Sequence, residues 1–216
     1  HRASGIVHPA MATRPDPPII TLTTDFGDLD SYVGVMKGVI LSIAPAAQVV
    51  DIVHSVPPQD IQAAAYHISV ATPHFPAGSI HVIVVDPGVG TERRALIVET
   101  ERATFIAPDN GVLTWILESE PPLRMIQLDN PAYQLDEVSK TFHGRDIFAP
   151  AAAHIARGVE LADLGAPASD PVRIPVYLLT RGLDGSVNGQ VQHIDRFGNA
   201  ITNIARDAIG PDSPHT

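Results

Sequence analysis

The sequence has no cysteine in its 216 residues. This absence excludes disulfide bonds, thiolate metal ligands and a cysteine nucleophile, and it is compatible with the cytoplasmic location that we expect. Positive charge is also scarce: 14 Lys and Arg stand against 24 Asp and Glu, which gives a net charge of -10 at pH 7. Neutralising phosphates requires clustered Lys and Arg, so the composition argues against nucleic acid and acidic membrane surfaces as partners.

Long apolar runs are missing as well, and none approaches the roughly 20 residues of a membrane-spanning helix. The residues before Met11 lack the apolar core of a signal peptide, so we expect residues 1–17 to be a tag or a disordered lead-in. With 44% hydrophobic residues, the chain can still bury the core of a large domain and a small one.

Short β-rich runs alternate with amphipathic segments through most of the chain. Strands are predicted at 19–24, 49–53, 80–85, 95–98, 104–107 and 124–128. Helices are predicted at 31–44, after Pro57-Pro58, around Trp115, and around 148–155. This alternation indicates a largely parallel sheet covered on both faces, hence a three-layer α/β/α domain over 18–167.

The character of the chain changes after Gly165. The segments 174–179 and 186–194 are predicted as strands with no helix between them. We therefore expect a second, all-β domain over 171–216.

Polar residues directly follow several of the predicted buried strands. Asp25, His54 and Asp86 do so, and the Asp109-Asn110 turn follows a fourth strand. One such aspartate is usually a turn residue or a helix cap, and the stretch 81–94 alone reads best as a hairpin. Together these residues favour a ligand site, because the carboxyl ends of parallel strands meet in one crevice.

The crevice is expected to be acidic, since Asp28 and Asp30 add to Asp25 and Asp86. It would therefore suit a substrate with positive charge and hydroxyl groups. A metal is not expected, because the aspartates after residue 24 lack the spacing of a calcium loop and no second histidine lies at ligand spacing from His143.

Five motifs occur in a fixed order between about residues 19 and 204. They are Thr24-Asp-Phe-Gly-Asp-Leu-Asp-Ser-Tyr-Val-Gly34, Val85-Asp-Pro-Gly-Val-Gly90 with Arg93, Ala107-Pro-Asp-Asn-Gly111, Phe142-His-Gly-Arg-Asp146 and Ile194-Asp-Arg-Phe-Gly-Asn199. Together they resemble the S-adenosyl-L-methionine (SAM) hydroxide adenosyltransferase family, the hydrolytic relatives of the fluorinase and chlorinase. The resemblance implies a three-layer α/β domain, a small C-terminal β-barrel and a homotrimer with active sites between subunits.

The implied reaction splits SAM with water into adenosine and L-methionine, without a cofactor. By resemblance, Asp86, Arg93 and His143 activate the water. The substrate-binding set implied by the motifs comprises Asp25 at the ribose hydroxyls, Asp30 and Asp195 near the methionine ammonium, Phe197 and Asn199 at the adenine, and Asn110. The glycines at 88 and 90 would give a ligand atom room to approach the backbone.

Two alternatives remain open from the sequence. A halogenase would use halide as the nucleophile, but halogenases carry a hydroxylated pocket where Asp86 and His143 stand, and an extra loop. The other alternative is a non-catalytic module that binds an adenosyl compound. In the family the barrel continues beyond the Thr202–Ile204 stretch and supplies a Ser-Arg pair for the methionine carboxylate, so the C-terminal domain is expected to be incomplete in this sequence.

Overall fold

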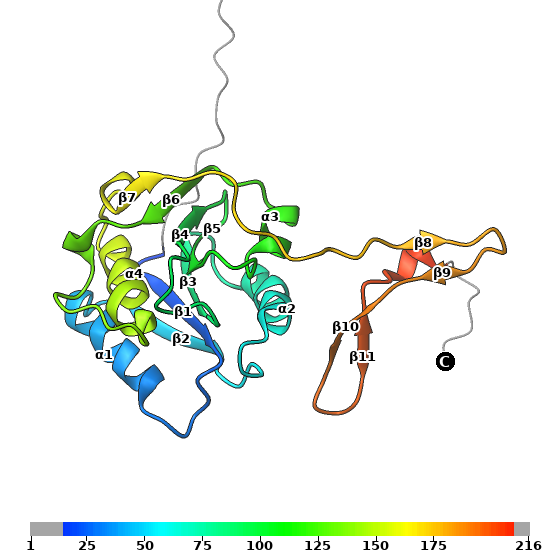
Figure 1. The fold of residues 1–216 in the computed structure, drawn as a ribbon, viewed down its shortest axis with the longest axis horizontal. Coiled ribbons are helices and arrows are strands. Elements are labelled where there is room, and N and C mark those ends of the chain that lie inside the picture. Colours follow the sequence, from blue (N-terminus) through cyan, green and yellow to red (C-terminus); the bar gives the residue numbers. More distant parts are fainter. Residues whose placement is uncertain (1–14, 210–216) are drawn as a thin grey trace, which may run out of the picture. The chain divides into compact units, whose positions relative to one another are not determined.

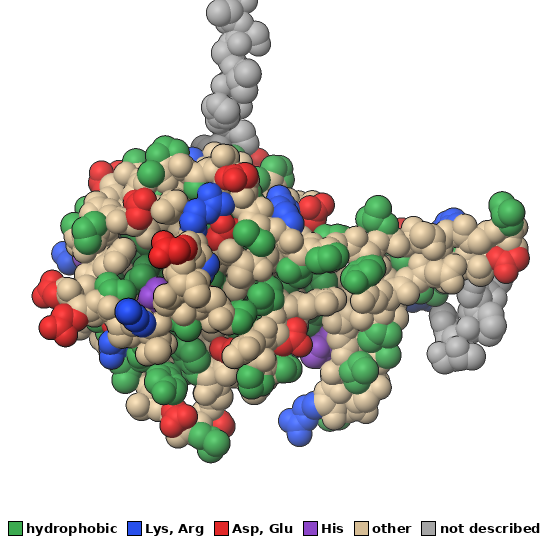
Figure 2. Space-filling view, viewed as in Figure 1, with side chains coloured by type: hydrophobic (Ala, Val, Ile, Leu, Met, Phe, Trp, Pro, Cys, Tyr) green, Lys and Arg blue, Asp and Glu red, His purple; other side chains and the backbone are tan. Residues whose placement is uncertain are grey.

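The computed structural model describes residues 15–209, and the expected lead-in lies mostly outside them (Figure 1). The chain divides into two compact units between Ile174 and Pro175. No helix in the described range is long and apolar enough to cross a membrane. On the face shown in Figure 2, acidic and basic side chains are interspersed over the first unit.

The first unit is built on a seven-stranded sheet with the order β2-β1-β3-β5-β4-β6-β7. Its strands are β1 (Ile19–Thr24), β2 (Gln48–Val53), β3 (Ser79–Val84), β4 (Ala95–Glu99), β5 (Ala103–Pro108), β6 (Arg124–Leu128) and β7 (Gly165–Pro167). The neighbours β2, β1, β3 and β5 pair in parallel, whereas the pairs from β5–β4 to β6–β7 are antiparallel.

Helices cover both faces of this sheet (Figure 1). The α-helices are α1 (Tyr32–Ile43), α2 (Ile61–Ala71), α3 (Thr114–Ser119) and α4 (Ala149–Ala156). Alternate side chains of β3 reach opposite cores: Val82 packs in the core with α1 and α4, and Ile83 in the core with α2 and α3. The predicted three-layer α/β fold is confirmed.

The chain also contains shorter helical turns, the last of which lies in the second unit. They are η1 (Thr72–His74), η2 (Pro131–Tyr133), η4 (Leu161–Asp163) and η5 (Arg206–Ala208), together with one turn of π-helix, η3 (Gly144–Phe148), which runs directly into α4. Helix α2 begins later than Pro57-Pro58 suggested, because the Asp60 side chain accepts a hydrogen bond from Ala63 N and caps the helix there.

Three details of the strand assignment were wrong. The strand β2 is largely exposed rather than buried, since it lies at the sheet edge with a neighbour on one side only. The strands β3 and β4 do not form a hairpin, because β5 lies between them. The segment 174–179 contains no strand.

The second unit contains two antiparallel strand pairs. These are β8 (Thr180–Arg181) with β9 (Val187–Asn188), and β10 (Val191–Ile194) with β11 (Ala200–Thr202). The predicted single strand over 186–194 is therefore split into β9 and β10. The strand pairs are consistent with a small barrel-like domain, and the predicted domain limits, 18–167 and 171–216, remain predictions.

Candidate active site

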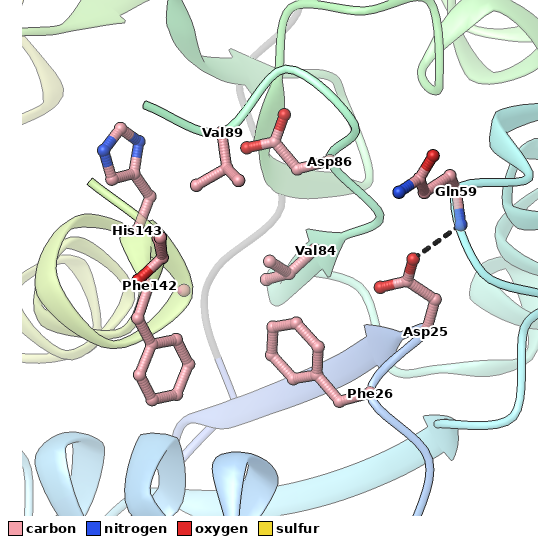
Figure 3. Close-up of a pocket in the computed structure, with 10 residues that line it drawn as sticks. Asp25, Phe26, Gln59, Val84, Asp86, Val89, Phe142 and His143 are labelled. Carbon is pink, nitrogen blue, oxygen red and sulfur yellow. Dashed lines mark hydrogen bonds between the residues drawn. The ribbon is translucent and has the colours of Figure 1, made fainter. Parts of the chain in front are cut away.

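The carboxyl edge of the parallel strands carries the polar residues that the sequence singled out. Asp25 follows β1, His54 follows β2 and Asp86 lies two residues beyond β3. A cavity of about 180 Å³ opens at this edge (Figure 3). It is lined by Asp25, Phe26, Gln59, Val84, Asp86, Val89, Thr141, Phe142, His143 and Gly144.

Arg93 joins Asp86 to His143. Its Nε lies 3.0 and 2.9 Å from the two carboxylate oxygens of Asp86, and its Nη2 lies 2.5 Å from Oδ2. The same Nη2 lies 2.6 Å from His143 Nδ1. The Asp86 and Arg93 side chains are only 4% and 10% exposed, so this ion pair is shielded from solvent.

The contact with Arg93 fixes the tautomer of His143. A guanidinium has donors and no acceptor, so His143 Nδ1 must accept from Arg93 and the proton of the neutral ring lies on Nε2. Burial and the nearby Arg93 cation lower the pKa of His143 below its ordinary value. The imidazole is therefore neutral at pH 7.

The approach of residues 139–143 to the Asp86 turn depends on Gly90. Gly90 has φ +75°, and a Cβ there would lie 2.2 Å from the carbonyl oxygen of Lys140. Clearance for a ligand was the expected reason for this glycine, and that interpretation is wrong at Gly90. The space is needed for the chain segment that brings His143 to Arg93.

Asp146 holds the other side of that segment. Its fully buried carboxylate accepts a hydrogen bond of 2.8 Å from Ser139 N and another of 2.5 Å from Arg145 Nε. Burial alone raises the pKa of Asp146, but the hydrogen bonds from Arg145 and Ser139 outweigh it and leave that pKa lowered. His143, which immediately precedes the π-helix η3, is thus held from both directions.

Asp25 lies on the opposite side of the cavity and points into it (Figure 3). Its Oδ2 accepts a hydrogen bond of 2.8 Å from Gln59 N. Next to it, the rings of Phe26, Tyr32 and Phe142 pack against one another with centroids 5.1 to 5.7 Å apart. A carboxylate beside an aromatic wall can bind hydroxyl groups on an otherwise apolar ligand.

Asp30 and Asn110 do not line this cavity. Asp30 is exposed in the loop before α1. The Asn110 side chain donates to Val85 O at 2.9 Å and accepts from Val112 N at 3.1 Å, so it fastens the end of β5 to the end of β3. Their substrate-binding roles stay predictions.

Asp195, Phe197 and Asn199 belong to the second unit, in the turn between β10 and β11. The Asp195 carboxylate accepts from the backbone N–H groups of Phe197 and Asn199, each at 2.9 Å, and from Asn199 Nδ2 at 2.7 Å. The hydrogen bonds from Asn199 and Phe197 lower the pKa of Asp195. Phe197 itself is 81% exposed. Their proposed contacts with substrate remain predictions.

Sequence reasoning missed several residues of the cavity wall, chiefly Gln59, Val89 and Thr141. Gln59 gave no signal, because its φ of +64° and its bond to Asp25 exist only in the folded chain. Phe142 stood within a recognised motif, but its packing against Phe26 was not foreseen. Among residues 15–209, no group of three or more His, Asp or Glu side chains is placed to hold a metal ion.

The fold and this cavity define an open α/β protein with a small-molecule site at the carboxyl edge of its parallel strands. Residues 20–165 match the model of the SAM hydroxide adenosyltransferase N-terminal domain. An (R)-S-adenosyl-L-methionine hydrolase from Thermus thermophilus is 43% identical over 198 residues, covering 87% of this chain and 74% of that protein. The chain therefore belongs to the SAM hydroxide adenosyltransferase family.

Two further proteins show the range of the similarity. A crystal structure of an uncharacterized conserved protein from Thermotoga maritima superposes with a TM-score of 0.84 at 38% identity, covering 88% of this chain and 73% of that one. A fluorinase from Actinoplanes sp. is 30% identical, covering 88% of this chain and 72% of that protein.

Proposed function

We propose that this chain hydrolyses S-adenosyl-L-methionine to adenosine and L-methionine. The family and the hydrolase relatives support the reaction, and hydrolases are more similar to this chain than the fluorinase is. The observation that carries the proposal is that Asp86 and His143, joined by Arg93, line a cavity that Asp25 also faces. The site combines a base for water with a carboxylate for ribose hydroxyls.

The reaction is an in-line displacement at the ribose C5′. Water attacks this carbon, the C5′–S bond breaks, and its electron pair returns to the sulfonium sulfur as a neutral thioether. The leaving group needs no acid, so the protein must only position one water and accept its proton. Asp86 takes that proton and later releases it to solvent.

Arg93 and His143 hold the Asp86 side chain in position for this role. The Arg93 guanidinium donates to both carboxylate oxygens of Asp86 and so fixes the orientation of that carboxylate. His143 accepts from Arg93 through Nδ1 and so fixes the guanidinium, which makes His143 an orienting group rather than the base. Because positive charge disperses in the transition state, a cavity wall of Phe26 and Phe142 assists the step by excluding water.

The finer parts of the proposal concern assembly and the second unit. The chain acts as a cytoplasmic homotrimer without a cofactor. Asp30 and Asp195 serve the methionine ammonium, and Phe197 and Asn199 serve the adenine. These assignments rest on the family resemblance and on the absence of cysteine from the sequence.

The direct test is to incubate the purified chain with SAM and separate the products by liquid chromatography. We expect adenosine and methionine in equal amounts, with one ¹⁸O atom in adenosine when the reaction runs in H₂¹⁸O. A halide-dependent 5′-halo-adenosine would replace the hydrolase assignment with a halogenase. Bound SAM that is recovered intact would make the chain a binding module.

A further inference from the structure

The pairing of β1 with β2 is irregular next to the cavity. Leu22 lies opposite Asp51, but Thr23 lies opposite Val53, so one extra residue of β2 is accommodated there. A bulge of this kind turns side chains that a regular strand would keep apart. Here it brings the Asp51 carboxylate to 2.9 Å from His54 Nε2, three residues along the chain.

The Asp51 contact sets the proton positions on His54. An ionised carboxylate only accepts, so we assign the proton of the neutral ring to Nε2, which faces Asp51 without the alignment of a hydrogen bond, and the acceptor role to Nδ1. Thr24 Oγ1 lies 2.9 Å from that Nδ1 and donates its hydroxyl proton to it. The same Oγ1 accepts from Phe26 N at 3.2 Å, which ties His54 to the turn that contains Asp25.

The backbone of His54 holds the same turn. Its carbonyl oxygen accepts a hydrogen bond of 2.7 Å from Gly27 N. Asp25 therefore lies between Thr24 and Phe26. The Thr24 hydroxyl contacts the His54 ring, and the Phe26 amide donates to that hydroxyl. On its other side, Gln59 N donates to the Asp25 carboxylate at 2.8 Å (Figure 3).

The contacts that run from Thr24 through His54 to Asp51 end at a charged residue, Lys37. Lys37 Nζ, from α1, lies 2.6 Å from Asp51 Oδ2. Burial tends to raise the pKa of Asp51, but the contacts with Lys37 and His54 leave it lowered, so the carboxylate stays ionised near neutral pH. The His54 side chain is 15% exposed and Thr24 is fully buried, which keeps water from replacing the contact between them.

We propose that His54 is a positioning residue that holds Asp25 in place for the ribose of the substrate. This role rests on the proposed function. His54 does not reach the cavity itself, because it acts through the Thr24 hydroxyl and the Gly27 amide. Removing the Nδ1 acceptor releases the Thr24 hydroxyl, whereas the His54 carbonyl still accepts from Gly27 N and the Asp86–Arg93–His143 group stays intact.

The primary variant is His54→Leu, which keeps an apolar side chain of similar length but has no acceptor for Thr24. We expect the KM for SAM to rise about tenfold, the size of one lost buried hydrogen bond, with kcat within about threefold. His54→Asn carries an oxygen near the position of Nδ1 and should restore most of the affinity. The control is His154→Leu on α4, which replaces a half-buried imidazole in edge-on contact with the Tyr133 ring and should leave both constants unchanged.

Two comparisons separate positioning from a general loss of structure. In an Asp25→Asn background, His54→Leu should change KM by less than about twofold, because its effect passes through the Asp25 carboxylate. With a 2′-deoxyribose analogue of SAM, His54→Leu should match the wild type in KM. Equal losses in both backgrounds, or equal losses on both substrates, would overturn the inference.

A second variant covers the case in which His54→Leu does not fold. Thr24→Val replaces the hydroxyl by a methyl group of the same shape and should raise KM by a similar factor. An unchanged KM in soluble Thr24→Val contradicts the positioning role. If the wild type releases no adenosine, calorimetric titration with adenosine answers the same question: weaker binding by the variants supports the positioning role even though hydrolysis fails.

Discussion

Arg93 uses one guanidinium for two different partners. Its Nε and Nη2 hold the Asp86 carboxylate, and Nη2 also reaches His143 Nδ1. The Phe148 ring lies 5.4 Å from the guanidinium carbon and closes the third side. A cation held in this way orients the Asp86 carboxylate and, together with burial, lowers the pKa of His143, and each effect leads to a test.

Asp86→Asn removes the base and preserves its shape. The amide oxygen can still accept from Arg93, but it cannot take a proton from water, so turnover should fall about a hundredfold or more. Adenosine affinity, measured by calorimetry, should stay within about threefold. The control is Asp136→Asn, an exposed carboxylate in the same unit that should behave as wild type. Wild-type turnover in Asp86→Asn would remove Asp86 from the mechanism.

Protonation of His143 should make kcat decrease at acid pH, which gives the pH profile of kcat an acid limb. Burial and Arg93 lower the pKa of His143 below the ordinary 6.5, so the neutral, accepting ring predominates above that lowered value. As pH falls through it, the protonated ring can no longer accept from Arg93 and repels it, and kcat should decrease. His143→Asn places an oxygen near Nδ1 that does not titrate. A pH profile of kcat should therefore lose this limb in the variant, and an unchanged limb would assign it to another group.

At the scale of elements, the active site depends on how the turn after β3 meets the loop before η3. The turn after β3 carries Asp86, and the loop before η3 carries His143, and the two meet where Gly90 faces Lys140. The π-helix η3 and the buried Asp146 then fix the loop on its far side. The site is therefore formed by the contact of two loops, each anchored to the same sheet.

Gly90→Ala tests that contact. Its Cβ would overlap the Lys140 carbonyl and strain a positive φ, so the free energy of unfolding should fall by about 1–3 kcal/mol. Turnover should fall more than tenfold, because the loop of His143 is displaced. The matched control is Gly158→Ala, which has φ +92° with no atom within 4 Å of the added carbon. Equal effects in the two variants would show that backbone strain alone matters.

The strand β3 carries a buried histidine outside the site. His81 Nδ1 lies 2.7 Å from Thr21 Oγ1, and its ring lies against Phe105 with centroids 5.1 Å apart. Burial lowers its pKa from 6.5 to about 3. The imidazole is therefore neutral in the folded chain across the whole range in which it gains a proton in the unfolded chain.

Stability should depend on pH accordingly. Between pH 6.5 and about 3 the unfolded state binds the proton and the folded state does not, so stability decreases as pH falls. The slope is at most about 1.4 kcal/mol per pH unit, or roughly 2 kcal/mol between pH 6.5 and 5. Urea unfolding at pH 7 and pH 5 measures it. His81→Asn, which can still accept from Thr21, should reduce this difference, and an equal difference in the variant would exclude His81 as its source.

At the scale of elements, pattern and propensity predicted most of the first unit. The strands β1, β3, β4, β5 and β6 and the helix α1 lie within one or two residues of their expected positions. The exposure of β2 was missed, because an edge strand and a central strand can have the same apolar residues. The absence of a strand over 174–179 was missed for a related reason, since β-propensity does not supply a partner.

At the scale of the whole molecule, the expected assembly is a homotrimer. The helix α1 exposes the apolar side chains Tyr32, Val35 and Leu41 at 46%, 38% and 43%. Light scattering after size exclusion should give about 69 kDa, three times the 23.0 kDa chain. A mass of one chain at micromolar concentration contradicts the expectation. Val35→Asp should lower the measured mass if α1 takes part.

The sequence by itself determined the family, the α/β architecture and the residues that carry charge at the strand ends. These features depend on local periodicity and on short motifs, which are written along the chain. Only the tertiary structure decided that Arg93 bridges Asp86 and His143, that Gly90 makes room for Lys140, and that a bulge joins Asp51 to His54. Each of these contacts joins segments through side-chain direction, backbone clearance or strand register, and those quantities are set only when the whole sheet has packed.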